Sequence, residues 1–232
     1  MNFERWKDLR DYRHPPACMD WRHVCMVNAM LEVCRPRSVV EIGCWRGFST
    51  AAIIEAHEKA PFERVDLVDL YIREDLKRNA GSIDGFHLTQ ISSDDFAGKP
   101  ECWLIDGNHE MQAFADYSAA LAARAKIIIL HDTMGGKHPL LPYNRGSGII
   151  AEFMRRNADG WFEDAKERKG ERTHRGLMFG FFYRPDEATV QQLGTRLTYL
   201  AGDEFAAPEW KLDGEDGSMR GEPVDEVGAP AQ

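Results

Sequence analysis

The sequence lacks long apolar runs, paired cysteine motifs and an excess of basic charge. No stretch of about 18 apolar residues occurs, so we expect no membrane-spanning helix. Residues 1–13 mix charged and aromatic side chains and contain no apolar stretch typical of a secretory signal, which predicts a cytoplasmic protein. The five cysteines include no Cys-x-x-Cys pair and are odd in number. This favours buried free thiols over a disulfide framework or a zinc knuckle.

The negative charge lies mostly near the C-terminus. The formal net charge is -9, and residues 203–232 alone hold nine acidic and two basic side chains. The rest of the chain is therefore nearly neutral and has no basic footprint for nucleic acid, so we expect neither a nucleic-acid nor a membrane partner. The acidic segment is poor in apolar residues, which predicts disorder. The sequence leaves open whether the chain forms a homo-oligomer.

Hydrophobic periodicity predicts an alternation of strands and helices. The first helix is expected over 20–34, before Pro36. Strands are expected at 38–43, 64–70, 86–91, 101–105 and 125–130. Helices are expected at 48–59, 74–79, 109–123, 149–157 and 186–200. Residues 161–166 and 177–183 are expected to form a closing hairpin.

This order of elements predicts an α/β fold, a Rossmann-like doubly wound sheet of seven strands. The sheet should be mostly parallel, with one antiparallel strand near the C-terminus. We expect a helical cap over 1–36, the main domain over 37–200 and the acidic tail over 203–232. Ligands of such sheets bind at the carboxyl ends of the strands. Polar residues stand at five of these ends, in segments 41–49, 69, 93–95, 106–109 and 131–132.

The turn after the first predicted strand carries the most specific motif. Gly43 and Gly47 would let the backbone turn tightly and approach a ligand closely. Trp45 stands where a dinucleotide fingerprint needs a glycine beside the pyrophosphate, which argues against NAD. Asp69, at the end of the second strand, can accept hydrogen bonds from ribose hydroxyls. A plain strand-to-helix turn is the alternative interpretation of the two glycines.

The run Glu41-Ile42-Gly43-Cys44-Trp45-Arg46-Gly47-Phe48-Ser49-Thr50 resembles motif I of class I S-adenosylmethionine-dependent methyltransferases, and the resemblance extends over roughly residues 20–185. It implies a set of cofactor contacts. The methionine part would be lined by Gly43, Trp45, Gly47 and Ser49, with Glu41 nearby. The ribose would lie on Asp69 and the adenine beside Ser93 and Asp94, and Asp106 would be a further contact of the cofactor.

A second cluster resembles one branch of these enzymes. The runs Ile105-Asp106-Gly107-Asn108-His109 and His131-Asp132-Thr133 look like those of macrocin-type and mycinamicin-type sugar O-methyltransferases and of cephalosporin hydroxylase-like proteins. The resemblance implies that Asp106 and Asp132 bind a divalent metal, Mg²⁺ or Mn²⁺, and that His109 is the general base. A metal lowers the pKa of a bound hydroxyl and an imidazole takes its proton, which is the chemistry that methylation of a hydroxyl needs.

His131 departs from that pattern, because the metal-dependent relatives carry an acid there, usually glutamate. Three outcomes follow: His131 binds a softer metal than magnesium, acts as the base itself, or shares the proton transfer with His109 without a metal. Taken one by one, these residues also have structural interpretations, since an Asp-Gly pair often forms a turn and a following histidine often caps a helix.

These observations predict an S-adenosylmethionine-dependent methyltransferase. Its acceptor would be the hydroxyl of a small polar molecule, such as a sugar or a secondary metabolite. A non-catalytic Rossmann-like binding module is the main alternative, which the presence of Asp106, His109 and Asp132 disfavours. An NAD-dependent oxidoreductase is a further alternative, which the missing third glycine disfavours.

Overall fold

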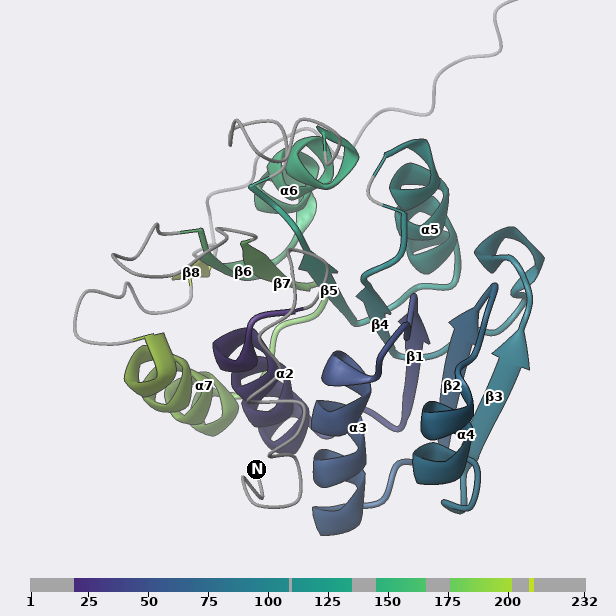
Figure 1. Cartoon of the computed structure of the whole chain (residues 1–232). Helices are drawn as coiled ribbons and strands as arrows, with labels where there is room; N and C mark the ends of the chain where they lie inside the picture. The colour runs from purple at the N-terminus through teal and green to yellow at the C-terminus, as the bar shows by residue number, and fades with distance from the viewer. Residues whose placement is uncertain (1–18, 109, 135–144, 166–175, 202–208, 211–232) are drawn as a thin grey trace, which may run out of the picture.

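The computed structural model describes residues 19–108, 110–134, 145–165, 176–201 and 209–210. Within these ranges one eight-stranded sheet has the order β3-β2-β1-β4-β5-β7-β6-β8 (Figure 1). The strands are β1 (Ser38–Ile42), β2 (Arg64–Asp69), β3 (Phe86–Gln90), β4 (Cys102–Ile105), β5 (Ile127–His131), β6 (Gly160–Asp164), β7 (Leu177–Phe181) and β8 (Glu209–Trp210). The helices are α2 (Trp21–Cys34), α3 (Phe48–Lys59), α4 (Glu74–Ala80), α5 (Met111–Ala122), α6 (Arg145–Asn157) and α7 (Glu187–Ala201), with the short 3₁₀ helix η1 (Ser93–Asp95).

The predicted fold class is confirmed. Strands β1 to β5 are parallel to one another, and β7 runs antiparallel between β5 and β6. The seven predicted strands are therefore present in a Rossmann-like sheet with one reversed strand. The two-residue strand β8 pairs antiparallel with β6 at the edge and was not predicted. It lies within the segment that the sequence assigns to the acidic tail, most of which is outside the described residues.

Each face of the sheet is covered by its own set of helices. One core contains side chains of α2, α3, α4 and α7 packed on alternate strand residues such as Val39, Leu104 and Ile129. The other core contains side chains of α5 and α6 packed on the intervening residues, such as Val40, Ile105 and Leu130. Burial on both faces explains why β5 reads as an unbroken apolar run in the sequence.

Helix α2, the first helix among the described residues, belongs to the first of these cores. It packs against α3 and α7, and its buried residues include Val24, Val27 and Leu31. It ends at Cys34, and its C-cap residue Arg35 has a left-handed backbone before Pro36. No described helix combines the length and the apolar character that crossing a membrane requires. The four described cysteines are free thiols, as predicted, and Cys18 lies outside the described residues.

Three boundaries near the candidate site differ from the predictions. Helix α6 begins at Arg145 and not at 149, because burial of Gly146 and Ser147 outweighs the low helix propensity of glycine. Helix α5 begins at Met111 and not at 109, since Asn108 Oδ1 accepts a hydrogen bond from the Glu110 N–H and forms a turn there (3.0 Å). Strand β5 extends to His131, which pairs with Leu177 of β7.

The carboxyl ends of β1 and β4 touch at Gly43. This glycine has φ 88°, and a Cβ atom placed on it would lie 2.6 Å from the carbonyl oxygen of Asp106 and 2.6 Å from the Cα of Gly107. Real Cβ atoms do not tolerate such distances to backbone atoms. A glycine is therefore required both for the left-handed conformation and for the close approach of the two turns.

We predict that Gly43→Ala is considerably more destabilising than Gly85→Ala. Gly85 also has positive φ (80°), but a Cβ there would meet its nearest neighbour at an ordinary 3.5 Å. Gly85→Ala should therefore cost only the left-handed strain, about 1–2 kcal/mol, whereas Gly43→Ala adds the overlap with the turn after β4. Urea unfolding of both variants measures the difference. Equal losses of stability would show that the close approach is not a constraint.

Candidate active site

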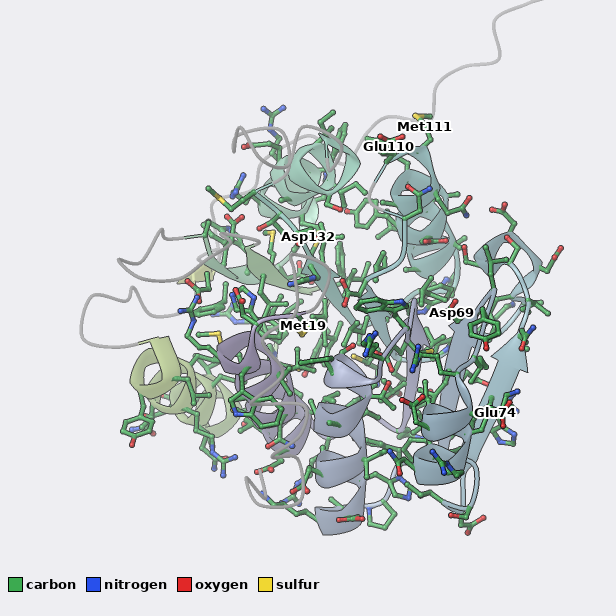
Figure 2. All side chains as sticks on the ribbon, viewed as in Figure 1. Met19, Asp69, Glu74, Glu110, Met111 and Asp132 are labelled. Carbon is green, nitrogen blue, oxygen red and sulfur yellow. The ribbon has the colours of Figure 1, made fainter. Side chains whose placement is uncertain are left out.

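A cavity of about 530 Å³ opens at the carboxyl ends of the parallel strands. Side chains following β1, β2, β3, β4 and β5 all line it, so it lies where the sequence predicts a ligand site. Asp69 is the last residue of β2 and Asp132 follows β5, and the two lie on opposite sides of β1 in the view of Figure 2. The lining residues are Met19, Ile42, Gly43, Cys44, Trp45, Arg46, Phe48, Ser49, Val68, Asp69, Leu70, Ile91, Ser92, Ser93, Asp106, Gly107, Asn108, Gln112, Asp116 and Asp132.

The turn after β1 is fixed by the carboxylate of Asp69. Asp69 Oδ2 accepts a hydrogen bond from the Trp45 N–H at 2.9 Å, and Oδ1 accepts one from the Tyr71 N–H at 3.0 Å. Trp45 takes the left-handed conformation (φ 32°), and its side chain is 43% exposed. Two backbone donors thus orient Asp69 on the cavity wall, and each oxygen keeps a lone pair for a further donor.

Glu41 lies below this turn, fully buried in β1. The hydroxyl of Thr50 donates to Oε2 at 2.6 Å, and the hydroxyl of Ser49 donates to Oε1. Burial raises the pKa of Glu41 to about 8 despite these two hydrogen bonds, and the charges of Asp106 and Asp69 add to the increase. Glu41 therefore joins β1 to the first turn of α3 and does not line the cavity.

Asp106, His131 and Asp132 form one compact group at the ends of β4 and β5. Nδ1 of His131 lies 2.6 Å from Oδ1 of Asp106 and 3.6 Å from Oδ1 of Asp132. One potential ligand atom from each residue lies within 4.8 Å of the others. The carboxylates of Asp106 and Asp132 line the cavity, whereas His131 is fully buried behind them. Two carboxylates and an imidazole that converge in this way fit a divalent transition metal.

A second buried polar group lies behind His131. Arg22 Nε donates to Asp164 Oδ2 at 2.8 Å, and Nε2 of His23 lies 3.3 Å from the same oxygen. The His23 ring stands edge-on to the His131 ring, with centroids 5.7 Å apart. Burial lowers the pKa of His23, and the hydrogen bond with Asp164 partly opposes this effect. Sequence reasoning missed this group, because its members come from α2 and β6 and share no local motif.

Sequence reasoning also missed Gln112 and Asp116, which line the cavity from α5. Gln112 Nε2 lies 3.0 Å from Ser93 Oγ, 2.8 Å from Asp94 Oδ1 and 3.3 Å from Asp116 Oδ1. The two residues are one helical turn apart in the helix that follows β4, so their i, i+4 spacing is the signal that would have placed them on one face.

The structure brings together most of the residues proposed from the sequence. Those lining the cavity are Gly43, Trp45, Ser49, Asp69, Ser93, Asp106 and Asp132. Those that lie beside or behind the lining are Glu41, Gly47, Asp94 and His131. His109 lies outside the described residues, although its neighbour Asn108 lines the cavity. Gly47 (φ 79°) is the N-cap residue of α3, so its role is in the turn itself.

Comparison with known proteins gives structural neighbours only. No protein-family model and no curated protein matches the chain by sequence. Among solved structures it is similar to the O-methyltransferase TomG from Streptomyces achromogenes, in complex with S-adenosylmethionine. The TM-score is 0.56 and the identity 14%, over 77% of this chain and 87% of that one.

Two further solved structures are similar to the same extent. For an O-methyltransferase from Bacillus cereus in complex with S-adenosylhomocysteine, the TM-score is 0.57 and the identity 14%, over 77% of this chain and 89% of the other. For the methyltransferase PaMTH1 from Podospora anserina, bound to S-adenosylhomocysteine, the values are 0.56 and 12%, over 78% and 87%. The chain therefore has the Rossmann-like fold of methyltransferases.

The raised pKa of Glu41 predicts a specific dependence of stability on pH. Its ordinary value is 4.5, which we take for the unfolded chain, and its folded value is about 8. Between these values the folded state binds the proton and the unfolded state does not, so the contribution of Glu41 to stability falls as the pH rises. The free energy of unfolding of the wild type relative to Glu41→Gln should therefore decrease from pH 4.5 to pH 8.

Urea unfolding of both proteins at several pH values measures this difference. Glu63→Gln is the matched control, because Glu63 is exposed and its hydrogen bonds with Arg37 lower its pKa. The difference between wild type and Glu63→Gln should stay constant above pH 5. A constant difference for Glu41→Gln as well would contradict the assignment of a raised pKa to Glu41.

Proposed function

We propose that the protein is an S-adenosylmethionine-dependent methyltransferase that methylates a hydroxyl of a small polar acceptor, such as a sugar or a secondary metabolite. The observation that carries the proposal is the single cavity wall formed by the Gly43 turn, Asp69 and Asp106. These residues come from β1, β2 and β4, and the sequence resemblance implies that all three contact the methyl donor.

The chemistry of this wall suits a nucleoside with no pyrophosphate. Asp69 offers oriented carboxylate oxygens to the ribose hydroxyls. The Gly43 turn presents backbone at the cavity wall, where the methionine part would lie. Trp45 occupies the position at which a dinucleotide fold needs a glycine, so its Cβ and ring would meet a pyrophosphate. A methyl donor is therefore favoured over NAD.

Methyl transfer is an in-line displacement at carbon. The acceptor oxygen forms a bond to the methyl carbon as the bond from that carbon to the sulfonium sulfur breaks, which leaves a neutral thioether. The acceptor hydroxyl must lose its proton to a base. We assign the base to His109, which directly follows the cavity residue Asn108. His131 is fully buried behind Asp106, where it orients that carboxylate, and an acceptor in the cavity would not reach it.

A divalent metal fits the group of Asp106, His131 and Asp132. The mixed nitrogen and oxygen donor set suits manganese better than magnesium, because magnesium prefers oxygen ligands alone. When bound, such a metal supplies a Lewis acid that lowers the pKa of a nearby hydroxyl. The acceptor would lie at the Asp106 end of the cavity, and His109 would receive the proton of its hydroxyl.

Calorimetric titration of the full-length protein tests the proposal. We expect S-adenosylmethionine to bind with a Kd in the micromolar range and NAD not to bind. We also expect Mn²⁺ to bind the wild type and to bind Asp132→Asn at least about tenfold more weakly, since a charged ligand is lost. Asp75→Asn, at a partly exposed carboxylate outside the cavity, is the control and should bind Mn²⁺ like the wild type.

Transfer of a labelled methyl group to a panel of sugars and hydroxylated metabolites tests the reaction itself. His109→Ala should retain S-adenosylmethionine binding and lose transfer by a factor of about 10²–10⁴. Undiminished transfer would remove His109 from the mechanism. If S-adenosylmethionine did not bind under any condition, the proposal would fail, and the non-catalytic binding module would take its place.

A further inference from the structure

The end of the cavity between η1 and α5 is rich in hydrogen-bond acceptors. Ser93 Oγ, Asp94 Oδ1 and Asp116 Oδ1 all lie within 3.3 Å of Gln112 Nε2. The amide nitrogen has only two hydrogens, so it cannot satisfy all three acceptors at once. Ser93, Gln112 and Asp116 line the cavity, and Asp94 does not. A ligand that fits this end should therefore present N–H donors.

Asp116 is the acceptor that most needs such a donor. Its side chain is buried (2% exposed), and no described residue donates a hydrogen bond to Oδ2. Burial raises the pKa of Asp116, although hydrogen bonds from Ser93 and Gln112 oppose the shift. A buried carboxylate oxygen without a donor loses its hydration and gains nothing in return, and a ligand N–H would offset that cost.

The position of this end relative to Asp69 identifies the ligand group. The sheet order places the residues after β3 next to β2, which carries Asp69, and places Asp132 three strands beyond β2. A nucleoside with its ribose on Asp69 and its sulfonium near Asp106 would thus direct its base toward η1 and α5. Leu70 and Ile91 provide apolar lining for a flat ring near Asp69. Adenine fits because its exocyclic amine donates hydrogen bonds, whereas hypoxanthine carries a carbonyl oxygen at that position.

We propose that Asp116 Oδ2 accepts a hydrogen bond from the exocyclic amine of the adenine ring and thereby makes the site specific for adenine. The proposal rests on the proposed function, since it assumes that the nucleoside is the methyl donor. It assigns the recognition of the amine to a residue of α5. The resemblance to known methyltransferases points only to Ser93 and Asp94, in η1.

The test compares the binding of S-adenosylhomocysteine with that of S-inosylhomocysteine, in which the carbonyl replaces the amine. In calorimetry on the full-length wild type, the adenine compound should bind at least about tenfold more tightly than the inosine compound. The reason is that the inosine compound leaves Oδ2 without its donor. In Asp116→Asn the preference should be lost or reversed, since the amide can donate to the carbonyl. Asp95→Asn makes the same change at an exposed residue outside the cavity and should keep the wild-type preference.

The outcomes separate this proposal from the proposed function. Equal binding of the two compounds by the wild type would overturn the role of Asp116 and leave the methyltransferase proposal standing. This comparison uses the wild type alone, so it does not depend on the folding of a variant. A full preference retained in Asp116→Asn would also overturn the role of Asp116. Binding of neither compound by the wild type would contradict both proposals.

Discussion

The close approach of Gly43 to the backbone of Asp106 and Gly107 is the constraint on which the cavity depends. It places the turn after β1 against the turn after β4, with no side chain between them. Asp69 then holds the first turn from β2, through its bond with the Trp45 N–H. Three neighbouring strand ends are joined in this way, and together they form the wall on which the proposed methyl donor would lie.

Buried polar contacts surround this wall on the protein side. Glu41 links β1 to the start of α3, and Asp164 links β6 to α2 through Arg22 and His23. Buried ionisable groups are costly unless they are paired, so such groups tend to be kept where they fix a geometry or support a function. Here they hold α2 and α3 on the sheet, and His131 lies between His23 and Asp106.

The sequence predicted the sheet well because hydrophobic patterns and glycine positions are local signals. The bounds of α3 were predicted to the residue, since apolar periodicity and the Gly47 turn both mark them. The predicted start of α6 was wrong, because the glycines on either side of Ser147 give no sign that this residue is buried in the protein. The strand β8 was missed since a two-residue pairing depends on its partner β6 alone.

The candidate site was predicted where its residues directly follow strands. Gly43, Asp106 and Asp132 belong to this group, and Asp69 is the last residue of β2. The order of a parallel sheet brings such positions to one edge. Asp116 was not predicted, because it lies inside a helix and reaches the cavity only through the way α5 packs beside η1. His131 was assigned to a strand end and is the last residue of β5, but its full burial was not predicted.

A crystal structure of the protein with S-adenosylhomocysteine is the most direct test of the central claim. The account predicts density for the nucleoside in the cavity at the strand ends, with the ribose on Asp69, the base toward Asp116 and the thioether sulfur facing Asp106. Density for the ligand elsewhere, such as in the hollow beside Asn28 and Tyr199 between α2 and α7, would contradict it.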